Sequence, residues 1–360
     1  MIIGGGLVGL ATAAALGERG ANVTVLDSRR KGVASTAAAG MLAPTMERAS
    51  AGSAAHAFAL AARDLYPSYL DALAEVSGLR VPLNREGVLE LVVDDDEADA
   101  RRQEIDREDD GGAQWIDRAR LGDVEPALAP VAGAVLYPRD GSVDNVLLVR
   151  ALSALVDASP TVTVVEDSAE AVELNGQRAV VRLRSGGRCE GFTLVLAAGA
   201  WSPLLQGLPR PIPVEPVRGQ AISLAAAPLR HVIYGPHGYV VPREGSRSVI
   251  GATMEHVGFD AGVTAETAPR LAAAASEIAP AFERARTLGH WSGLRPVTPD
   301  FLPIIGRDPE HPALIYACGH SRNGILLAPL TGECVANLAS GAAPALDITP
   351  FSVVRFSSAE

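Results

Sequence analysis

The sequence predicts an α/β protein in which a mostly antiparallel α+β domain is inserted into a doubly wound domain with a parallel sheet. The chain begins with a short apolar strand, a glycine turn and an alanine-rich helix, which is a typical start of a parallel βαβ unit. Two later apolar runs, 192–199 and 314–319, also end in glycine and are expected to join the same sheet. Residues 211–253, in contrast, have the pattern of antiparallel strands.

The first turn carries the spacing G-x-G-x-x-G. Gly4 fits the tight turn, Gly6 the close approach of the backbone to a pyrophosphate, and Gly9 the packing of helix on strand. Asp27 ends the next apolar run, where a carboxylate accepts hydrogen bonds from a ribose. The sequence therefore predicts a dinucleotide site in a Rossmann-type domain. Only three residues precede the turn, which is short for a central strand and suggests that the true start lies upstream.

Composition limits the classes of function. A chain of 360 residues with 48% hydrophobic side chains suits two domains, and a net charge of −11 argues against nucleic acid or an anionic membrane as partner. No run is long and apolar enough to span a bilayer. Cys189, Cys318 and Cys334 lack C-x-x-C spacing, which indicates reduced thiols in the cytoplasm. The histidines show no metal-ligand spacing, so no metal is predicted.

Periodicity and turn residues predict the other elements. Helices are expected at 7–19, 54–77, 94–110, 146–157, 265–279 and 325–338, and strands at 23–27, 88–93, 134–137, 162–165, 171–174, 179–183, 192–198, 211–224, 232–242, 248–253 and 314–320. The run 32–44 is made of small, weakly polar residues with flanking glycines, and is expected to be a loop that lies against a flat or anionic ligand. Its Ser35 and Thr36 can donate hydrogen bonds to phosphate.

Several segments together resemble the glycine oxidase branch of the D-amino acid oxidase family of FAD-dependent amine oxidases. They are GGGLVGLATAAAL at 4–16, AAAGMLAP at 37–44, DGSVD at 140–144, PVRGQ at 216–220, GLRPVTPDFLPIIG at 293–306 and GHSRNGILLAPLTGE at 319–333. The resemblance covers nearly the whole chain, and the last two segments are its most specific part.

This resemblance implies that FAD is bound non-covalently, that a small amine substrate is oxidised to an imine, and that O2 is reduced to hydrogen peroxide. Relatives with a covalent flavin carry a cysteine just before the T-P-D segment, and Ser292 to Arg295 contain none. Glycine oxidases of this branch supply dehydroglycine for the thiazole of thiamine, and relatives are often tetramers. The implied FAD-binding domain comprises 1–80, 140–212 and 296–360, and the implied substrate-binding domain 81–139 and 213–295.

The resemblance also assigns residues to the substrate. Arg295 matches an arginine that pairs with the substrate carboxylate, for which a planar guanidinium offers two parallel N–H donors. Tyr239 matches a tyrosine whose hydroxyl reaches the same carboxylate, Arg322 an arginine beside the flavin, and His237 and Met254 positions near the pocket. For these four residues a purely structural role stays open: Tyr239 as a sheet tyrosine, Arg322 in a surface ion pair, His237 as a loop histidine and Met254 as a core methionine.

The residues expected to contact FAD come from six segments of the chain. They are Gly4, Gly6, Leu7, Val8, Gly9, Asp27, Ser28, Ser35, Thr36, Ala38, Gly40, Met41, Leu42, Ala198, Gly199, Trp201, Arg295, Arg322, Asn323, Gly324, Ile325 and Leu326. The last of these segments opens a helix, whose positive end stabilises the negative charge of a reduced flavin.

Other functions remain compatible with the sequence. Sarcosine or a small D-amino acid could replace glycine as the preferred substrate. The enzyme could instead be a dehydrogenase that passes electrons to a quinone or a partner protein, although no basic amphipathic segment suited to a membrane is found. A nucleotide-binding module without catalysis is a third class. Aromatic hydroxylases share the glycine turn, but their later Gly-Asp flavin motif is absent.

Overall fold

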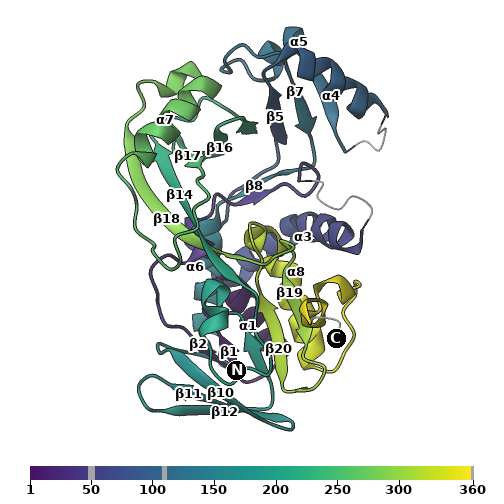
Figure 1. Cartoon of the computed structure of the whole chain (residues 1–360), viewed down its shortest axis with the longest axis vertical. Helices are drawn as coiled ribbons and strands as arrows, with labels where there is room; N and C mark the ends of the chain where they lie inside the picture. The colour runs from purple at the N-terminus through teal and green to yellow at the C-terminus, as the bar shows by residue number, and fades with distance from the viewer. Residues whose placement is uncertain (48–52, 108–111, 358–360) are drawn as a thin grey trace.

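The computed structural model describes residues 1–47, 53–107 and 112–357. One end of the elongated molecule holds a parallel sheet with its helices, and the other end holds a larger, mostly antiparallel sheet (Figure 1). The predicted α/β architecture is confirmed. The limits predicted for the two domains remain a prediction.

The first sheet has six strands, and β19 alone is antiparallel to its neighbour. In spatial order they are β19 (Ile304–Arg307), β20 (Leu314–Cys318), β13 (Leu194–Leu196), β1 (Ile2–Ile3), β2 (Val23–Leu26) and β9 (Val162–Val165). The two later apolar runs thus join β1 in one sheet, as expected. The chain leaves β1 towards β2 on one side and returns as β13 on the other, which makes β1 and β13 the point where ligands bind in such sheets.

Four long helices belong to this end of the molecule: α1 (Leu7–Glu18), α3 (Ala54–Ser77), α6 (Asn145–Ala158) and α8 (Gly324–Ala339). Helix α1 is buried along most of its length because its alanines allow close packing. A Cβ on Gly332 of α8 would lie 2.8 Å from the backbone of Ala11, so these two helices are in backbone contact. Ser53 caps the start of α3, and Gly78 ends it in a left-handed conformation.

The second sheet has eight strands, and the β15–β5 pair is its parallel exception. In order they are β18 (Thr287–Val297), β14 (Glu215–Leu224), β17 (Arg247–Gly251), β16 (Gly238–Arg243), β15 (Val232–Gly235), β5 (Val88–Val92), β7 (Gly133–Tyr137) and β6 (Gln114–Asp117). Its helices are α4 (Asp95–Arg107), α5 (Arg118–Val124) and α7 (Thr267–Ile278). The long strands β14 and β18 extend from this sheet to the first one (Figure 1).

The remaining described elements are smaller. They are α2 (Ala34–Ala37), β3 (Met41–Leu42), β4 (Leu83–Asn84), β8 (Gly141–Val143), β10 (Ala169–Asn175), β11 (Arg178–Leu183), β12 (Arg188–Gly191) and the 3-10 helices η1 (Gly199–Leu204), η2 (Pro280–Phe282), η3 (Thr349–Phe351) and η4 (Val353–Phe356). The run 32–44, expected to be a loop, therefore contains one helical turn and one short strand. The predicted charged helix is α4, and residues 108–110 of that prediction lie outside the described residues.

A buried carboxylate fixes the strand pair β19–β20 to the chain before β14. The side chain of Asp308 is 0% exposed and accepts hydrogen bonds from Arg210 Nε and the Tyr316 hydroxyl, each at 2.8 Å. Burial opposes the charge of Asp308, but Arg210 and Tyr316 hold the pKa of its carboxyl below the ordinary value.

Replacing Asp308 by asparagine should lower the free energy of unfolding by about 2 kcal/mol, because charge-assisted hydrogen bonds are lost at a buried site. Glu310→Gln is the matched control, since Glu310 also pairs with Arg210 but its side chain is 72% exposed. Urea denaturation of both variants and of the wild type measures the difference. Because the pKa of Asp308 is lowered in the folded state, the difference should be full at neutral pH and should shrink below about pH 4. Equal effects of the two substitutions would contradict this.

Across the described ranges, every helix is too short or too polar to pass through a membrane.

Candidate active site

The glycine turn between β1 and α1 is built as its sequence requires. Gly4 has φ +111°, and a Cβ there would lie 2.3 Å from the carbonyl oxygen of Ala197. A Cβ on Gly9 would lie 1.9 Å from the carbonyl oxygen of Gly4. The start of α1 therefore lies directly above the ends of β1 and β13, with its free N–H groups at the crevice. The N–H of Leu7 donates to the hydroxyl of Ser35 at 2.9 Å.

A cavity of about 470 Å³ begins at this turn and reaches the second sheet. Of the residues predicted to bind the cofactor or the substrate, it is lined by Gly4, Gly6, Leu7, Val8, Asp27, Ser28, Ser35, Ala38, Ala198, Gly199, Trp201, Tyr239, Arg295, Arg322, Gly324 and Ile325. These residues come from five distant segments of the chain. One continuous space therefore joins the glycine turn to the two candidate carboxylate-binding side chains.

Other predicted cofactor residues lie outside the cavity lining; they are Gly9, Thr36, Gly40, Met41, Leu42, Asn323 and Leu326. Gly9 packs under the turn, as described above. Gly40 is buried, and a Cβ there would lie 2.1 Å from the carbonyl oxygen of Val143, so it supports the connection to β8. Leu326 belongs to the core of the first sheet. The structure therefore gives these three residues packing positions.

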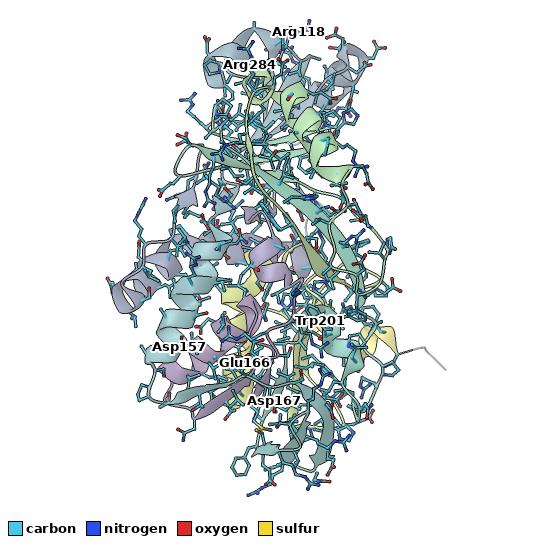
Figure 2. All side chains as sticks on the ribbon, turned by 90° about the vertical axis from the view of Figure 1, so that its left-hand side faces the viewer. Arg118, Asp157, Glu166, Asp167, Trp201 and Arg284 are labelled. Carbon is cyan, nitrogen blue, oxygen red and sulfur yellow. The ribbon has the colours of Figure 1, made fainter. Side chains whose placement is uncertain are left out.

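Part of the cavity lining was not predicted from the sequence. The loop after β9 and the β10–β11 hairpin contribute Asp167, Ser168, Ala169, Glu170, Arg182 and Arg184. Arg30 also lines the cavity, and its guanidinium lies 5.7 Å from the centre of the Trp201 ring. Figure 2 shows Trp201 and Asp167 in the same half of the molecule, far from Arg118 and Arg284. The hairpin was expected, but no local motif relates it to the cavity.

Arg295 and Tyr239 reach the cavity from the second sheet. Arg295 lies on β18 opposite Val217, and its Nη1 donates to the carbonyl oxygen of Thr253 at 3.0 Å. Within the described ranges, no carboxylate forms an ion pair with Arg295. Tyr239 lies on β16, and burial raises the pKa of its hydroxyl against the opposing charge of Arg295. The cavity thus holds an unpaired cation and a neutral phenol on one wall.

The segment before α8 forms another wall of the cavity. Arg322 lines the cavity and pairs with Glu47 at 2.8 Å. Burial alone would lower the pKa of the Arg322 guanidinium, but the charge of Glu47 outweighs this and holds that pKa above its ordinary value. His320 is buried in the lining, its Nε2 lies 3.2 Å from the hydroxyl of Thr331, and burial lowers its pKa to about 4. His320 is therefore a neutral side chain near physiological pH. Cys318 also lines the cavity, and burial raises the pKa of its thiol to about 12.

Two predicted pocket residues lie on the surface. The side chain of His237 is 69% exposed and pairs with Glu277 of α7 at 2.7 Å. Met254 is 60% exposed, which also excludes its alternative as a core methionine. Neither residue lines the cavity. Among the described residues, no cluster of three or more histidine, cysteine or acidic side chains is suited to a metal ion.

The residues of the cavity fit FAD. The glycine turn leaves no room for a Cβ at Gly4, and the cavity passes directly over Gly4, Gly5 and Gly6, where a pyrophosphate can approach backbone N–H groups. The carboxylate of Asp27 lines the cavity at the end of β2, where it can accept hydrogen bonds from ribose hydroxyls. The remainder of the cavity extends to Arg295 and Tyr239, as a cofactor that reacts with a carboxylate-bearing substrate requires.

Comparison with known proteins agrees with this geometry. Residues 1–338 match the family model described as DAO: FAD dependent oxidoreductase. The chain is 35% identical over 363 residues to the glycine oxidase of Geobacillus kaustophilus, covering 98% of this chain and 96% of that protein. It is 35% identical to the bifunctional protein ThiO/ThiG of Nostoc sp., covering 94% of this chain and 52% of that protein.

The fold comparison gives the same result. The crystal structure of glycine oxidase from Geobacillus kaustophilus matches with a TM-score of 0.91 at 34% identity, covering 98% of this chain and 97% of that one. A family match over most of the chain and a similar fold at this identity leave one conclusion. The chain belongs to the DAO family of FAD-dependent oxidoreductases.

Proposed function

We propose that the protein oxidises glycine, or a similarly small amino acid, to the imine and reduces O2 to hydrogen peroxide. One observation carries the proposal. A single cavity connects the glycine turn with Arg295 and Tyr239, so a cofactor and a small carboxylate fit in it together. We further propose that the segments 1–80, 140–212 and 296–360 bind FAD, and that 81–139 and 213–295 bind the substrate.

In this proposal Arg295 anchors the substrate carboxylate through parallel N–H donors, and Tyr239 donates its hydroxyl to the same group. The burial that raises the pKa of Tyr239 keeps this hydroxyl protonated, as a donor must be. When bound, FAD accepts the hydride that the amine loses from its α-carbon. The chain contributes orientation, and we find no need for an acid–base pair. His237 and Met254 are outside this proposed site.

The small residues beside Arg295 support a small substrate. Gly219, Ala221, Ala252 and Gly293 line the same cavity and carry no side chain larger than a methyl group. The similarity to a glycine oxidase of nearly the same length supports glycine itself. A supply of dehydroglycine for the thiazole of thiamine is supported by the similarity to bifunctional ThiO/ThiG proteins, of which this chain matches 52%. A cytoplasmic homotetramer remains part of the proposal by family resemblance.

Oxygen uptake and peroxide formation test the proposal. Purified holoenzyme should turn over glycine with one peroxide formed per O2 consumed, and sarcosine and D-alanine should rank the substrates within the same class. Turnover that requires an artificial electron acceptor, with no peroxide, would identify a dehydrogenase instead. A protein that binds FAD but is reduced by none of these amines would be a binding module without catalysis.

A further inference from the structure

The register of β14 and β18 determines where the guanidinium of Arg295 lies. Side chains on one face of a strand recur every second residue, so Val217, Gly219 and Ala221 share a face of β14. Arg295 is paired with Val217 and therefore belongs to the same face. Its side chain runs diagonally from β18 across β14, and its end reaches Gly219.

The guanidinium lies directly against the backbone of Gly219. A Cβ built at this position would lie 2.3 Å from Arg295 Nη1 and 2.5 Å from both Cζ and Nη2. Ordinary contacts between carbon and other heavy atoms are about 1 Å longer or more. Any side chain at position 219 would therefore occupy the place of the guanidinium. Gly219 has no positive φ, so the backbone itself does not demand glycine there.

The segment after β17 holds the guanidinium from the side. Its Thr253 carbonyl accepts from Arg295 Nη1 at 3.0 Å. The segment pairs with β14: the N–H of Arg218 donates to the carbonyl of Glu255 at 2.9 Å, and the N–H of Gln220 donates to the Thr253 hydroxyl at 2.9 Å. Thr253 is thus fixed to the same stretch of backbone that carries Gly219.

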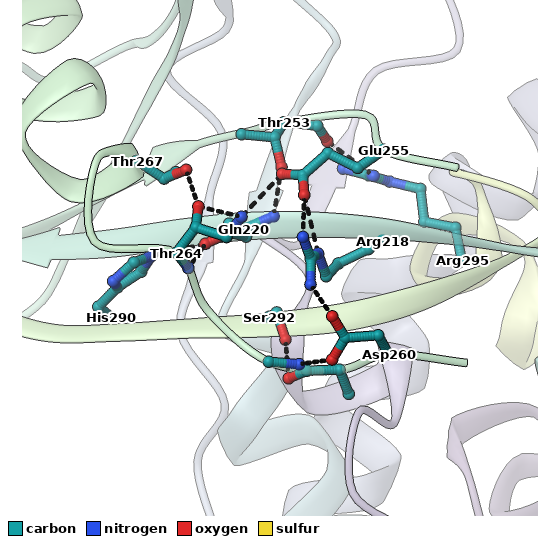
Figure 3. Close-up of polar contacts among 12 residues, drawn as sticks. Arg218, Gln220, Thr253, Glu255, Asp260, Thr264, Thr267, His290, Ser292 and Arg295 are labelled. Atoms are coloured by element: carbon teal, nitrogen blue, oxygen red, sulfur yellow. Dashed lines mark hydrogen bonds and ion pairs between the residues drawn. The ribbon is translucent and has the colours of Figure 1, made fainter. Parts of the chain in front are cut away.

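Side chains on the opposite face of β14 lock this pairing (Figure 3). Arg218 Nε donates to Glu255 at 2.8 Å, and Gln220 Nε2 donates to the other oxygen of that carboxylate at 2.8 Å. Arg218 also pairs with Asp260 at 2.7 Å. Both Arg218 and Gln220 are buried, so the segment has little freedom to move the Thr253 carbonyl.

We propose that Gly219 is a positioning residue, which together with the Thr253 carbonyl forms a seat for the Arg295 guanidinium and fixes the depth at which a substrate carboxylate binds. The inference rests on the proposed function, because it takes Arg295 as the carboxylate anchor. A methyl group at position 219 would displace the guanidinium by about 1 Å towards the cavity, into the space of the carboxylate. Misplacement on this scale costs up to about a hundredfold in rate.

Tyr239, the second candidate group for binding the carboxylate, also lies against a glycine, on the neighbouring strand β17. Gly251 on β17 is paired with both Ala221 and Tyr239. A Cβ on Gly251 would lie 2.5 Å from the Tyr239 hydroxyl oxygen. Both proposed carboxylate-binding groups therefore rest on glycines of adjacent strands, which is consistent with a surface shaped to hold them close to the sheet.

Acetate, a carboxylate without the reacting amine, is the probe for the seat. Its dissociation constant is measured from the perturbation of the flavin spectrum in oxidised holoenzymes of wild type, Gly219→Ala, Arg295→Ala and the double variant. We expect Gly219→Ala to weaken acetate binding about tenfold or more and to lower kcat/KM for glycine about 10- to 100-fold. In the Arg295→Ala background the same change should alter acetate binding less than twofold, because the displaced group is absent. FAD content should be unchanged throughout.

Gly289→Ala is the matched control, since Gly289 lies on β18, the strand that carries Arg295, but a Cβ there would make only an ordinary 3.7 Å contact with Trp291. If Gly219→Ala binds acetate as tightly as wild type does, the seat is overturned but the Arg295 anchor is not. The same holds if Gly219→Ala weakens acetate binding equally in the presence and in the absence of Arg295. Unchanged acetate binding in Arg295→Ala would overturn the anchor and the seat with it. If Gly219→Ala yields no folded protein, the seat predicts that the double variant folds, because the three atoms nearest to the added methyl all belong to Arg295. Failure of both to fold would overturn it.

Discussion

Replacing Arg295 by alanine should weaken the binding of acetate to the oxidised holoenzyme, and lower kcat/KM for glycine, by about 30-fold to a few thousand-fold. The range corresponds to the roughly 2–5 kcal/mol lost when one partner of a buried, hydrogen-bonded charge pair is removed. Within the described ranges no carboxylate of the protein neutralises Arg295, so the substrate is its partner in our account. The loss should therefore appear in carboxylate binding and leave FAD bound.

Two further variants sharpen this test. Arg295→Lys keeps the charge but loses the planar pair of donors, so its effect should be smaller than that of alanine and still measurable. Arg286→Ala removes an exposed arginine just before β18 and should behave as wild type. Spectral titration with acetate and steady-state kinetics with glycine measure all three. Affinity that is the same in Arg295→Ala and wild type would remove the carboxylate anchor from the account.

Replacing Gly9 by alanine should weaken the binding of FAD and lower the flavin content of the purified protein. The added Cβ would lie 1.9 Å from the carbonyl oxygen of Gly4, a backbone atom that can move only if the whole turn opens. Overpacking of this kind costs about 1–3 kcal/mol. If this strain destabilises only the conformation of the turn that binds FAD, it corresponds to roughly 5- to 150-fold weaker FAD binding. Titration of the apoprotein with FAD, followed by flavin fluorescence, measures the affinity.

Gly122→Ala is the control for this variant. Gly122 also lies in a helix, α5, but a Cβ there meets nothing within 4 Å. This variant should bind FAD as wild type does. Circular dichroism must show that the Gly9→Ala protein is folded, so that loss of flavin reports on the turn. Undiminished FAD content in folded Gly9→Ala would contradict the role given to the turn.

The nucleotide end of the fold could be predicted because its signals are local. The strand, turn and helix at 2–18 are adjacent in sequence, and each glycine at 4 and 9 is required by a steric contact within or next to that turn. Helix α3 was predicted with its observed limits, because its apolar positions recur at helical spacing and Gly78 marks its end; the structure adds Ser53 as the cap at its start. The strands β13 and β20 are apolar throughout, as central parallel strands are, and Gly199 and Gly319 follow them in the chain.

The second sheet was harder to predict because its signals are not local. Strand β18 was not predicted at all, since its residues 287–297 mix two glycines with polar and aromatic side chains and show no clear alternation. It becomes a strand by pairing with β14 along almost its whole length. The contact between Gly219 and Arg295 depends on that register, and residues 76 positions apart in sequence give no sign of it.

The residues of the candidate site also divide into those that have a local sequence signal and those that do not. Cofactor residues in short motifs, such as Gly4, Asp27 and Ser35, line the cavity, whereas Met41 and Leu42 pair with β8 instead. The side chains of the β10–β11 hairpin reach the cavity only through tertiary packing, for which the sequence holds no motif. His237 and Met254 were assigned by resemblance alone, and the structure places both on the surface.

Anaerobic mixing of the purified yellow holoenzyme with glycine tests the central claim most directly, namely that one cavity holds FAD and an amino acid whose carboxylate is bound by Arg295. Glycine should bleach the flavin in the wild type, admission of O2 should restore the colour with release of peroxide, and Arg295→Ala should need far higher glycine concentrations for the same bleaching. A flavin that stays oxidised with glycine, sarcosine and D-alanine alike, or that bleaches equally in Arg295→Ala, would contradict the account.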